Sequence, residues 1–366
     1  MEETTSSLGV SMTKAMRNRV HLVGSVSLPS ATAVFEQVSA RVGNDIARLS
    51  DGETGERGVP FPFRTDLAAS ITNTPGMVFK HVWKVSADLT FDLYGLAPGA
   101  RAQDIEFGAL GFATAAKASY TEFKRLRAAG KIPTDVRMQV SLPTPLLVEI
   151  SFVTVADVVP LWPAFERAML RELKEIAAAI PHADLAIQWD VAAEICTILE
   201  GGMPQLAQMI SREQVLNSII RITEAVPPDI PTGWHFCYGD TGVSTEDCET
   251  HHIVEPRDLG VLVALANDLC ARVKRSLDWL HMPVPRTRDD PVYFAPLENL
   301  RLKPGMQLYL GLVHKRDGLE GAKRRIAAAK SFYPTFGVGT ECGLGRRKPE
   351  DIPGLLDLHH EVACSL

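Results

Sequence analysis

The chain has 366 residues, of which 46% are hydrophobic, and a formal net charge of −6 at pH 7. An acidic balance without a run of basic residues excludes nucleic acid and anionic membrane surfaces as expected partners. No apolar run reaches the ~20 residues of a membrane span, and the first residues lack the apolar stretch of a signal peptide. Because the six cysteines are too sparse for a disulfide scaffold, the sequence predicts a cytoplasmic protein that acts on small molecules.

Residues 1–18 are expected to form a mobile tail, and short apolar runs then alternate with longer amphipathic stretches over residues 19–366. The predicted strands are 20–26, 45–50, 136–142, 184–190, 233–238, 277–282, 306–313 and 336–342. The predicted helices are 31–42, 110–129, 162–180, 211–225, 258–276 and 319–330. Because strands separated by helices pair in parallel, this pattern predicts one α/β domain, a single (β/α)8 TIM barrel. A doubly wound open sheet is the alternative.

Three intervals do not fit a simple repeat of strand and helix. The interval between predicted strands 2 and 3 is too long for one crossover, and predicts an extra helical insertion or a lid that includes 57–70. A second insertion, rich in Pro and Arg, follows predicted strand 6 at 284–305. The segment 247–252 (DCETHH) lies between two elements and is expected to be a surface loop.

Polar residues stand at or just beyond the ends of several predicted strands. They are Ser25, Glu53, Asp190, His235, Cys237, His314 and Cys342. In a β/α barrel the active site is built at the C-terminal ends of the strands. We therefore expect these side chains to meet at one rim of the barrel.

His235 and Cys237 are two positions apart in a predicted strand, so their side chains point to the same side. Zinc binds histidine nitrogen and cysteine sulfur, and a catalytic zinc site with three protein ligands keeps a fourth position open. Cys342, on the last predicted strand, is a reasonable third ligand. The alternative is that His235 and Cys237 pack in the core, where cysteine is common.

Three further residues each have two interpretations. Glu53, in the glycine-rich stretch 49–57 (LSDGETGER), either receives a cationic group over the barrel mouth or lies in a solvated turn. Asp190 ends an apolar run, where it either binds substrate or forms a structural ion pair or helix cap. His314 is either a proton donor or a residue at the start of a helix.

The order of HLVGSV, DGE, LPTP, IQWD, WHFCYGD, LVH and ECGLGRR along the chain resembles the C-terminal catalytic barrel of cobalamin-independent methionine synthase. That superfamily also contains uroporphyrinogen decarboxylase and the zinc-dependent coenzyme M methyltransferases. The similarity spans roughly residues 19–350. It implies a TIM barrel, a zinc cofactor and the transfer of a methyl or alkyl group to a thiol such as that of homocysteine. The implied activity is like that of a 5-methyltetrahydropteroyltriglutamate–homocysteine methyltransferase.

The resemblance also implies a role for each candidate residue. The residues that match the zinc ligands are His235, Cys237 and Cys342. Ser25 and Glu53 match residues that hold the amino-acid substrate. Asp190 matches the aspartate that binds the substrate amine, and His314 matches a histidine of proton transfer.

One family ligand has no counterpart in this chain. The synthase supplies a glutamate from its sixth strand, where this sequence has Met282, Pro283 or Val284. Glu298 and Glu341 are the candidates to replace it. Glu341 is adjacent to Cys342, so on a strand it should face the other way.

The length of the chain leaves room for one of the two barrels of the full synthase. The methyl donor is therefore expected to be a corrinoid protein or a small molecule, and folate is not assumed. Two alternative functions stay open. One is a metal-free decarboxylase or zinc-assisted lyase, and the other is a non-catalytic barrel that binds an amino acid or a thiol.

Overall fold

The structure is a computed structural model that describes residues 19–57, 64–84, 90–239 and 254–366. The predicted mobile tail, the segment 247–252 and part of the predicted lid lie outside these residues. Within them, no helix combines the length and the apolar character needed to cross a membrane.

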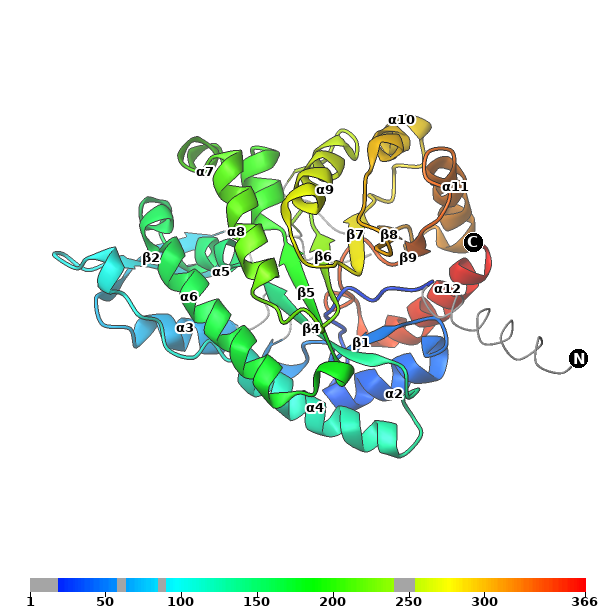
Figure 1. The fold of residues 1–366 in the computed structure, drawn as a ribbon, viewed down its shortest axis with the longest axis horizontal. Helices are drawn as coiled ribbons and strands as arrows, with labels where there is room; N and C mark the ends of the chain where they lie inside the picture. Colours follow the sequence, from blue (N-terminus) through cyan, green and yellow to red (C-terminus); the bar gives the residue numbers. More distant parts are fainter. Residues whose placement is uncertain (1–18, 58–63, 85–89, 240–253) are drawn as a thin grey trace, which may run out of the picture.

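A curled parallel sheet forms the centre of the molecule (Figure 1). It is seven-stranded, in the order β1-β4-β5-β6-β7-β8-β9, and every neighbouring pair is parallel. The strands are β1 (Arg48–Ser50), β4 (Arg137–Pro143), β5 (Leu185–Val191), β6 (Thr232–Phe236), β7 (Trp279–Pro283), β8 (Gln307–Gly311) and β9 (Gly337–Val338). This arrangement fits the expected TIM-like barrel, with one difference at the first predicted strand.

The segment 20–26 is not a continuous strand among the described residues. Its bridges are Val20 to Ile46, Val20 to Val338 and Val26 to Leu344, all parallel. β1 and β9 are the two edges of the sheet. Val20 lies between them, since it bridges both Ile46, just before β1, and Val338 of β9. The backbone leaves the ladder near Gly24, where an added Cβ would lie 2.9 Å from Oε1 of Glu53. The eighth strand is thus reduced to bridges where the chain passes a candidate site residue.

Helices surround the outer face of the sheet (Figure 1). The longer ones are α2 (Ala31–Val42), α4 (Phe112–Ala128), α6 (Val155–Ala179), α8 (Arg212–Glu224), α9 (Gly260–Arg272), α11 (Gly318–Lys330) and α12 (Ile352–Cys364). The shorter α-helices are α5 (Pro145–Phe152), α7 (Pro204–Met209) and α10 (Pro291–Phe294), and η4 (Glu194–Leu199) is a π-helix. The helix predicted from residue 162 begins earlier, at Val155, because the helix accommodates Pro160 and Pro163 in its N-terminal part. Proline usually interrupts a helix, so its presence shifted the predicted start.

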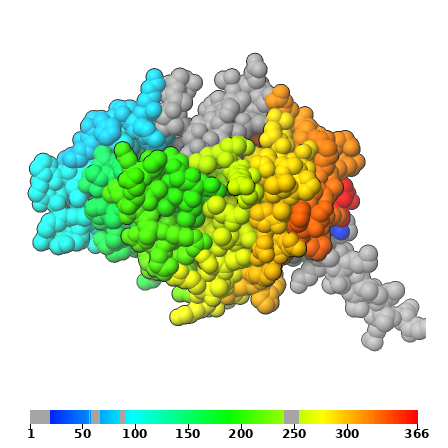
Figure 2. All heavy atoms as spheres, turned by 90° about the horizontal axis from the view of Figure 1, so that it is seen from above, coloured from blue at the N-terminus to red at the C-terminus, as the bar shows by residue number. Residues whose placement is uncertain are grey.

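Between β1 and β4 the chain forms an antiparallel hairpin that the sequence did not predict. α3 (Arg64–Thr72) precedes β2 (Met77–Lys84), which pairs with β3 (Thr90–Leu96). This region lies at one end of the molecule, far from the orange and red C-terminal elements (Figure 2). After Met77, every residue of β2 is exposed or half-buried. The strand therefore lacks the buried alternating positions from which a strand is predicted.

The central strands have two different faces. Trp189 of β5 and Trp234 of β6 are partners in the sheet and fully buried. The indole N–H of Trp234 donates to Oγ1 of Thr223 in α8, so this face points outward to the helices. Because side chains alternate along a strand, Asp190 and His235 point to the interior of the barrel.

Close packing at Gly233 of β6 gives a test of this interior. A Cβ added there would lie 2.2 Å from a ring carbon of Trp279. We expect Gly233→Ala to lower the free energy of unfolding by about 1–3 kcal/mol, because the indole must shift. Gly354→Ala in α12, where an added Cβ meets nothing within 4 Å, should leave it unchanged or raise it by up to about 1 kcal/mol. Denaturant unfolding of both variants measures the difference, and equal stabilities would contradict the packing.

Candidate active site

Three of the predicted residues converge at the C-terminal edge of the sheet. His235 lies in β6, Cys237 directly follows that strand, and Cys342 lies in the loop after β9. Their ligand atoms are all within 4.8 Å of one another, and the two sulfur atoms are 4.0 Å apart. The two-residue strand period brings His235 and Cys237 together, and the curled sheet brings in Cys342 from the far end of the sequence.

The imidazole of His235 is held at one nitrogen only. Its side chain is buried, and Nδ1 lies 2.8 Å from Nδ1 of His281. Nε2 has no hydrogen-bond partner among the described residues. A buried nitrogen without a partner is unfavourable unless it binds a ligand. One imidazole nitrogen and two thiol sulfurs are the donors that zinc prefers, so these residues fit a zinc ion.

The pKa values of the two thiols are shifted in opposite directions. The hydrogen bond with Cys237 holds the pKa of Cys342 well below its usual value, and the nearby His235 and Arg346 lower it further. The same hydrogen bond, together with burial, raises the pKa of Cys237. One proton is therefore easily lost from the pair, while removal of the second requires a cation close by.

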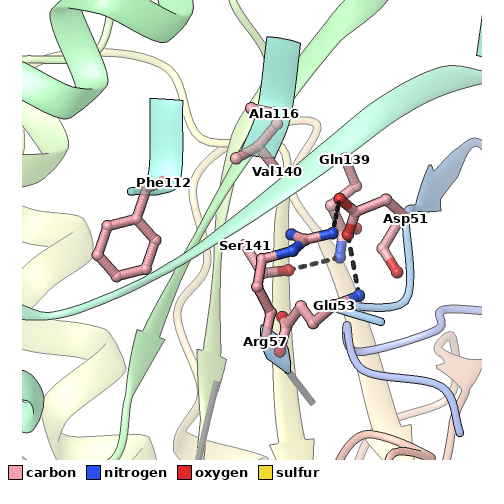
Figure 3. Close-up of a pocket in the computed structure, with 9 residues that line it drawn as sticks. Asp51, Glu53, Arg57, Phe112, Ala116, Gln139, Val140 and Ser141 are labelled. Carbon is pink, nitrogen blue, oxygen red and sulfur yellow. Dashed lines mark hydrogen bonds and ion pairs between the residues drawn. The ribbon is translucent and has the colours of Figure 1, made fainter. Parts of the chain in front are cut away.

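Glu53 lies on a tight turn after β1. It has φ 50°, in the left-handed region that few residues other than glycine adopt, and it follows Gly52 with φ 76°. Oδ1 of Asp51 accepts from the backbone N–H of Glu53 at 2.9 Å, and Oδ2 pairs with Arg57 at 2.7 Å. Figure 3 shows Arg57 reaching to Asp51 with Glu53 beside them. These contacts hold the strained residue in place.

A small pocket opens beside this turn (Figure 3). The lining residues are Ser50, Asp51, Glu53 and Arg57, then Phe112 and Ala116 of α4, and Gln139, Val140 and Ser141 of β4. Its walls combine an apolar side from the helix with carboxylates from the turn. Its free volume of about 10 Å³ is room for about one water molecule, so it is a gap in the packing and not a substrate pocket.

Two acidic side chains share the interior near this pocket. Burial raises the pKa of Glu53 to about 8, with a further increase from Asp51 and an opposing effect from Arg57. Burial also raises the pKa of Asp190, and Glu53 adds to that effect, although Asp190 accepts from Nε2 of Gln188 at 2.9 Å. A cation placed near them would favour their charged forms. The acidic pair therefore suits an ammonium group.

Ser25 lies against the loop that carries Cys342. Its carbonyl accepts from the N–H of Leu344 at 2.6 Å, and its Oγ accepts from the N–H of Gly345 at 3.3 Å. At Gly343 an added Cβ would lie 2.3 Å from Oγ of Ser25. Only glycine allows the two segments to approach so closely.

His314 follows β8 and is buried. Nε2 lies 2.9 Å from the carbonyl of Val284, to which it donates. Burial and the charge of Arg325 lower the pKa of His314 to about 3. The imidazole is therefore neutral at neutral pH, and its role in proton transfer stays a prediction.

The positions expected to replace the family glutamate carry no carboxylate ligand in the described structure. Met282, Pro283 and Val284 are buried apolar residues. Glu298 is exposed, and Glu341 is buried. Burial raises the pKa of Tyr293, and Tyr238 and Glu341 add smaller increases. Neither glutamate belongs to the ligand group found among the described residues. Among the described residues, the candidate centre therefore has three protein ligands.

Sequence reasoning missed His281 and Gln188. His281 is fully buried and is the register partner of His235 in the neighbouring strand. Gln188 donates to Asp190 and accepts from His21 at 2.8 Å. Strand alternation carries the signal for both, since Gln188 is two residues from Asp190 and the β7 residue beside an inward His235 also faces inward.

The fold and these residues define a TIM-like barrel with a candidate His/Cys/Cys metal centre beside the buried Glu53 and the half-buried Asp190. No protein-family model and no curated protein matches the chain. Solved structures do match it. A B12-independent methionine synthase from Shewanella sp. W3-18-1, in complex with selenomethionine, has a TM-score of 0.59 at 15% identity, covering 94% of this chain and 98% of that chain.

Two further structures are similar. A putative vitamin-B12 independent methionine synthase from Listeria monocytogenes has a TM-score of 0.50 at 13% identity, covering 92% of this chain and 86% of that one. A methyltransferase from Methanosarcina mazei has a TM-score of 0.51 at 10% identity, covering 97% of each chain. The resemblance to cobalamin-independent methionine synthase is thereby confirmed at the level of fold.

The raised pKa of Glu53 makes the stability of the protein depend on pH. Both the folded and the unfolded chain hold the proton below the usual carboxyl pKa of 4.5, and only the unfolded chain loses it between there and about 8. Stability contributed by this group is therefore lost as the pH rises through that window. Glu53→Gln should be less destabilised than the wild type when the pH rises from 5.5 to 8.

Denaturant unfolding at both pH values measures this, and Glu361→Gln, at an exposed position of α12, is the control. The control should follow the wild type. A pH dependence in Glu53→Gln as steep as in the wild type would show that Glu53 is not protonated in the folded protein.

Proposed function

We propose that the protein is a zinc-dependent transferase that moves a methyl or alkyl group to the thiol of an amino-acid substrate resembling homocysteine. The observation that carries the proposal is the meeting of His235, Cys237 and Cys342 within 4.8 Å of one another. The two acids beside them, Glu53 and Asp190, supply a place for a substrate amine. The selenomethionine bound to the Shewanella synthase, an amino acid with a methylated selenium atom, supports this substrate class.

In this proposal His235, Cys237 and Cys342 hold the zinc ion. When bound, the ion would lower the pKa of a substrate thiol and fix the sulfur in position. Thiols need this help because at pH 7 they are mostly protonated. The three-ligand set leaves a fourth position for the substrate.

The protein residues orient the rest of the substrate. Glu53 and Asp190 bind the ammonium group and become ionised as it arrives, since the pKa of each is raised in the protein alone. Ser25 is proposed to contact the carboxylate. His314 is proposed to relay to the leaving group the proton that the substrate thiol gives up, because its own low pKa keeps it neutral.

The methyl donor is proposed to be a corrinoid protein or a small molecule. The described residues contain one barrel-like sheet, and a second barrel that would help to bind a polyglutamyl folate is not among them. Small-molecule and corrinoid donors can be compared directly in an assay with a common thiol acceptor.

A rival function uses the acids and not the metal. The pKa of Glu53, at about 8, is close to the working pH that general acid and base catalysis needs. That property favours a metal-free decarboxylase of the same superfamily over the zinc-assisted lyase. The decarboxylase would stay active without metal, which separates it from the transferase.

The first test is metal content. Protein purified without an affinity tag is expected to contain about one zinc ion per chain by elemental analysis, as three-ligand sites do. Cys237→Ser and Cys342→Ser should each lose it, because each removes one of three ligands. Cys270→Ser, a buried cysteine of α9 outside the ligand group, is the matched control. Zinc retained in both ligand variants would contradict the centre.

The second test concerns the substrate amine. Asp190→Asn should raise KM for an amino-acid thiol by roughly 10–100-fold, the effect of losing a charged hydrogen bond. KM for a thiol of the same length without the amino group should not change. Steady-state kinetics with both thiols gives the comparison. An equal increase for the two acceptors would show that Asp190 does not bind the amine.

A further inference from the structure

The hydrogen bonds behind His235 form a chain that ends on a backbone carbonyl. Nδ1 of His235 lies 2.8 Å from Nδ1 of His281, and Nε2 of His281 lies 3.0 Å from the carbonyl oxygen of Thr340. All three groups are buried. In each contact one atom therefore has to donate a proton and the other has to accept it. Two donors or two acceptors facing each other would be left unpaired where water cannot reach them.

The carbonyl of Thr340 fixes the direction of both hydrogen bonds. A carbonyl oxygen can only accept, so Nε2 of His281 carries a proton. Nδ1 of His281 is then the lone-pair nitrogen of a neutral ring, and it accepts from Nδ1 of His235. With its proton at Nδ1, a neutral His235 has its lone pair at Nε2.

The opposite direction of the hydrogen bond, from His281 to His235, is unfavourable. If His281 donated from Nδ1, its ring would be cationic and Nδ1 of His235 would accept. The proton of a neutral His235 would then sit at Nε2 and point to the thiols, where a sulfur atom could accept it. This arrangement is unfavourable because it leaves a charged His281 ring buried, whereas the first one keeps both rings neutral.

We propose that His281 is a positioning residue that fixes the tautomer of His235, so that His235 presents the Nε2 lone pair toward Cys237 and Cys342. The inference rests on the proposed function, because it deepens the role of the same centre. His281 touches the metal ligand and not the reacting atoms. Mutation of a residue that hydrogen-bonds to a metal-ligating histidine typically lowers metal affinity by about 10–100-fold.

The same contact ties two ligands together. Thr340, whose carbonyl accepts from His281, also donates from Oγ1 to the carbonyl of Cys342 at 2.7 Å. His281 therefore lies between the strand that carries His235 and the loop that carries Cys342. Gly339 lets the loop pass close to the segment of His21, since an added Cβ there would lie 2.6 Å from the carbonyl oxygen of His21. Removing His281 should disturb both ligands at once.

Two variants separate the hydrogen bond from the bulk of the ring. His281→Leu keeps a buried side chain of similar size but has no acceptor. His281→Asn keeps an oxygen at the position of Nδ1 that can accept from His235. Competition with a chromophoric chelator should show zinc affinity reduced roughly 10–100-fold in His281→Leu and largely restored in His281→Asn. The control is His359→Leu, at a buried histidine of α12 whose Nδ1 is bonded to Leu355.

Cobalt substitution supplies a spectroscopic readout that loss of stability alone does not move. Folded His281→Leu should bind Co²⁺ with an altered ligand-field spectrum, because the imidazole is no longer aimed at the ion, while His359→Leu should give the wild-type spectrum. Wild-type affinity and spectrum in His281→Leu would overturn the role of His281. Absence of metal from the wild-type chain would instead overturn the proposed function.

The tautomer itself can be measured without metal. Nitrogen-15 labelling of the histidines in the full chain, with assignment by His235→Gln, should show that His235 carries its proton at Nδ1 in the metal-free protein. In His281→Leu this preference should disappear. A proton at Nε2 of wild-type His235 would overturn the inference, whatever the metal content.

Discussion

The register of β5, β6 and β7 is the constraint on which the site depends. Asp190 pairs with His235, and His235 pairs with His281, so three polar side chains stand in one row across adjacent strands. A shift of one residue in β6 would turn His235 outward and bring Trp234 into the row. The outward faces resist such a shift, because Trp189 and Trp234 are fully buried there and Trp234 is bonded to α8. The packing of large apolar side chains outside the sheet thus fixes the positions of the polar groups inside it.

A polar interior has to provide its own hydrogen bonds. Gln188 shows how this barrel does so: its amide oxygen accepts from His21 at 2.8 Å and from the indole of Trp279 at 3.3 Å, and its amide nitrogen donates to Asp190 at 2.9 Å. The carboxyl groups are accommodated differently, since burial raises the pKa of both Asp190 and Glu53. Both groups therefore keep their protons to a higher pH than free carboxyl groups do, and a cation nearby would favour their charged forms.

Much of the fold could be predicted from the sequence, because the central strands are apolar runs between amphipathic helices. β4, β5 and β8 lie within a residue or two of the predicted segments. The segment 20–26 was predicted as a strand from its apolar residues, but among the described residues it forms isolated bridges, from Val20 to both edges of the sheet and from Val26 to Leu344. The hairpin of β2 and β3 was missed because most of β2 is exposed, and the alternation of buried Phe91 and Leu93 in β3 covers only a few residues. In the site, residue types and strand ends gave the candidate ligands, whereas His281 was missed because its importance comes from a partner on another strand.

The three candidate ligands come from parts of the fold that are held in different ways. His235 lies inside a central strand, paired on both sides, whereas Cys342 lies in a loop after β9, the shortest strand of the sheet. Strand pairing cannot fix that loop, so local contacts have to. Ser25 binds the backbone at Leu344 and Gly345, and Thr340 donates to the carbonyl of Cys342. If Ser25 contacts the substrate as proposed, a substrate that moved Ser25 would also change the support of the loop that carries Cys342. The proposal therefore couples substrate binding to the geometry of a metal ligand through the segment that connects the two edges of the sheet.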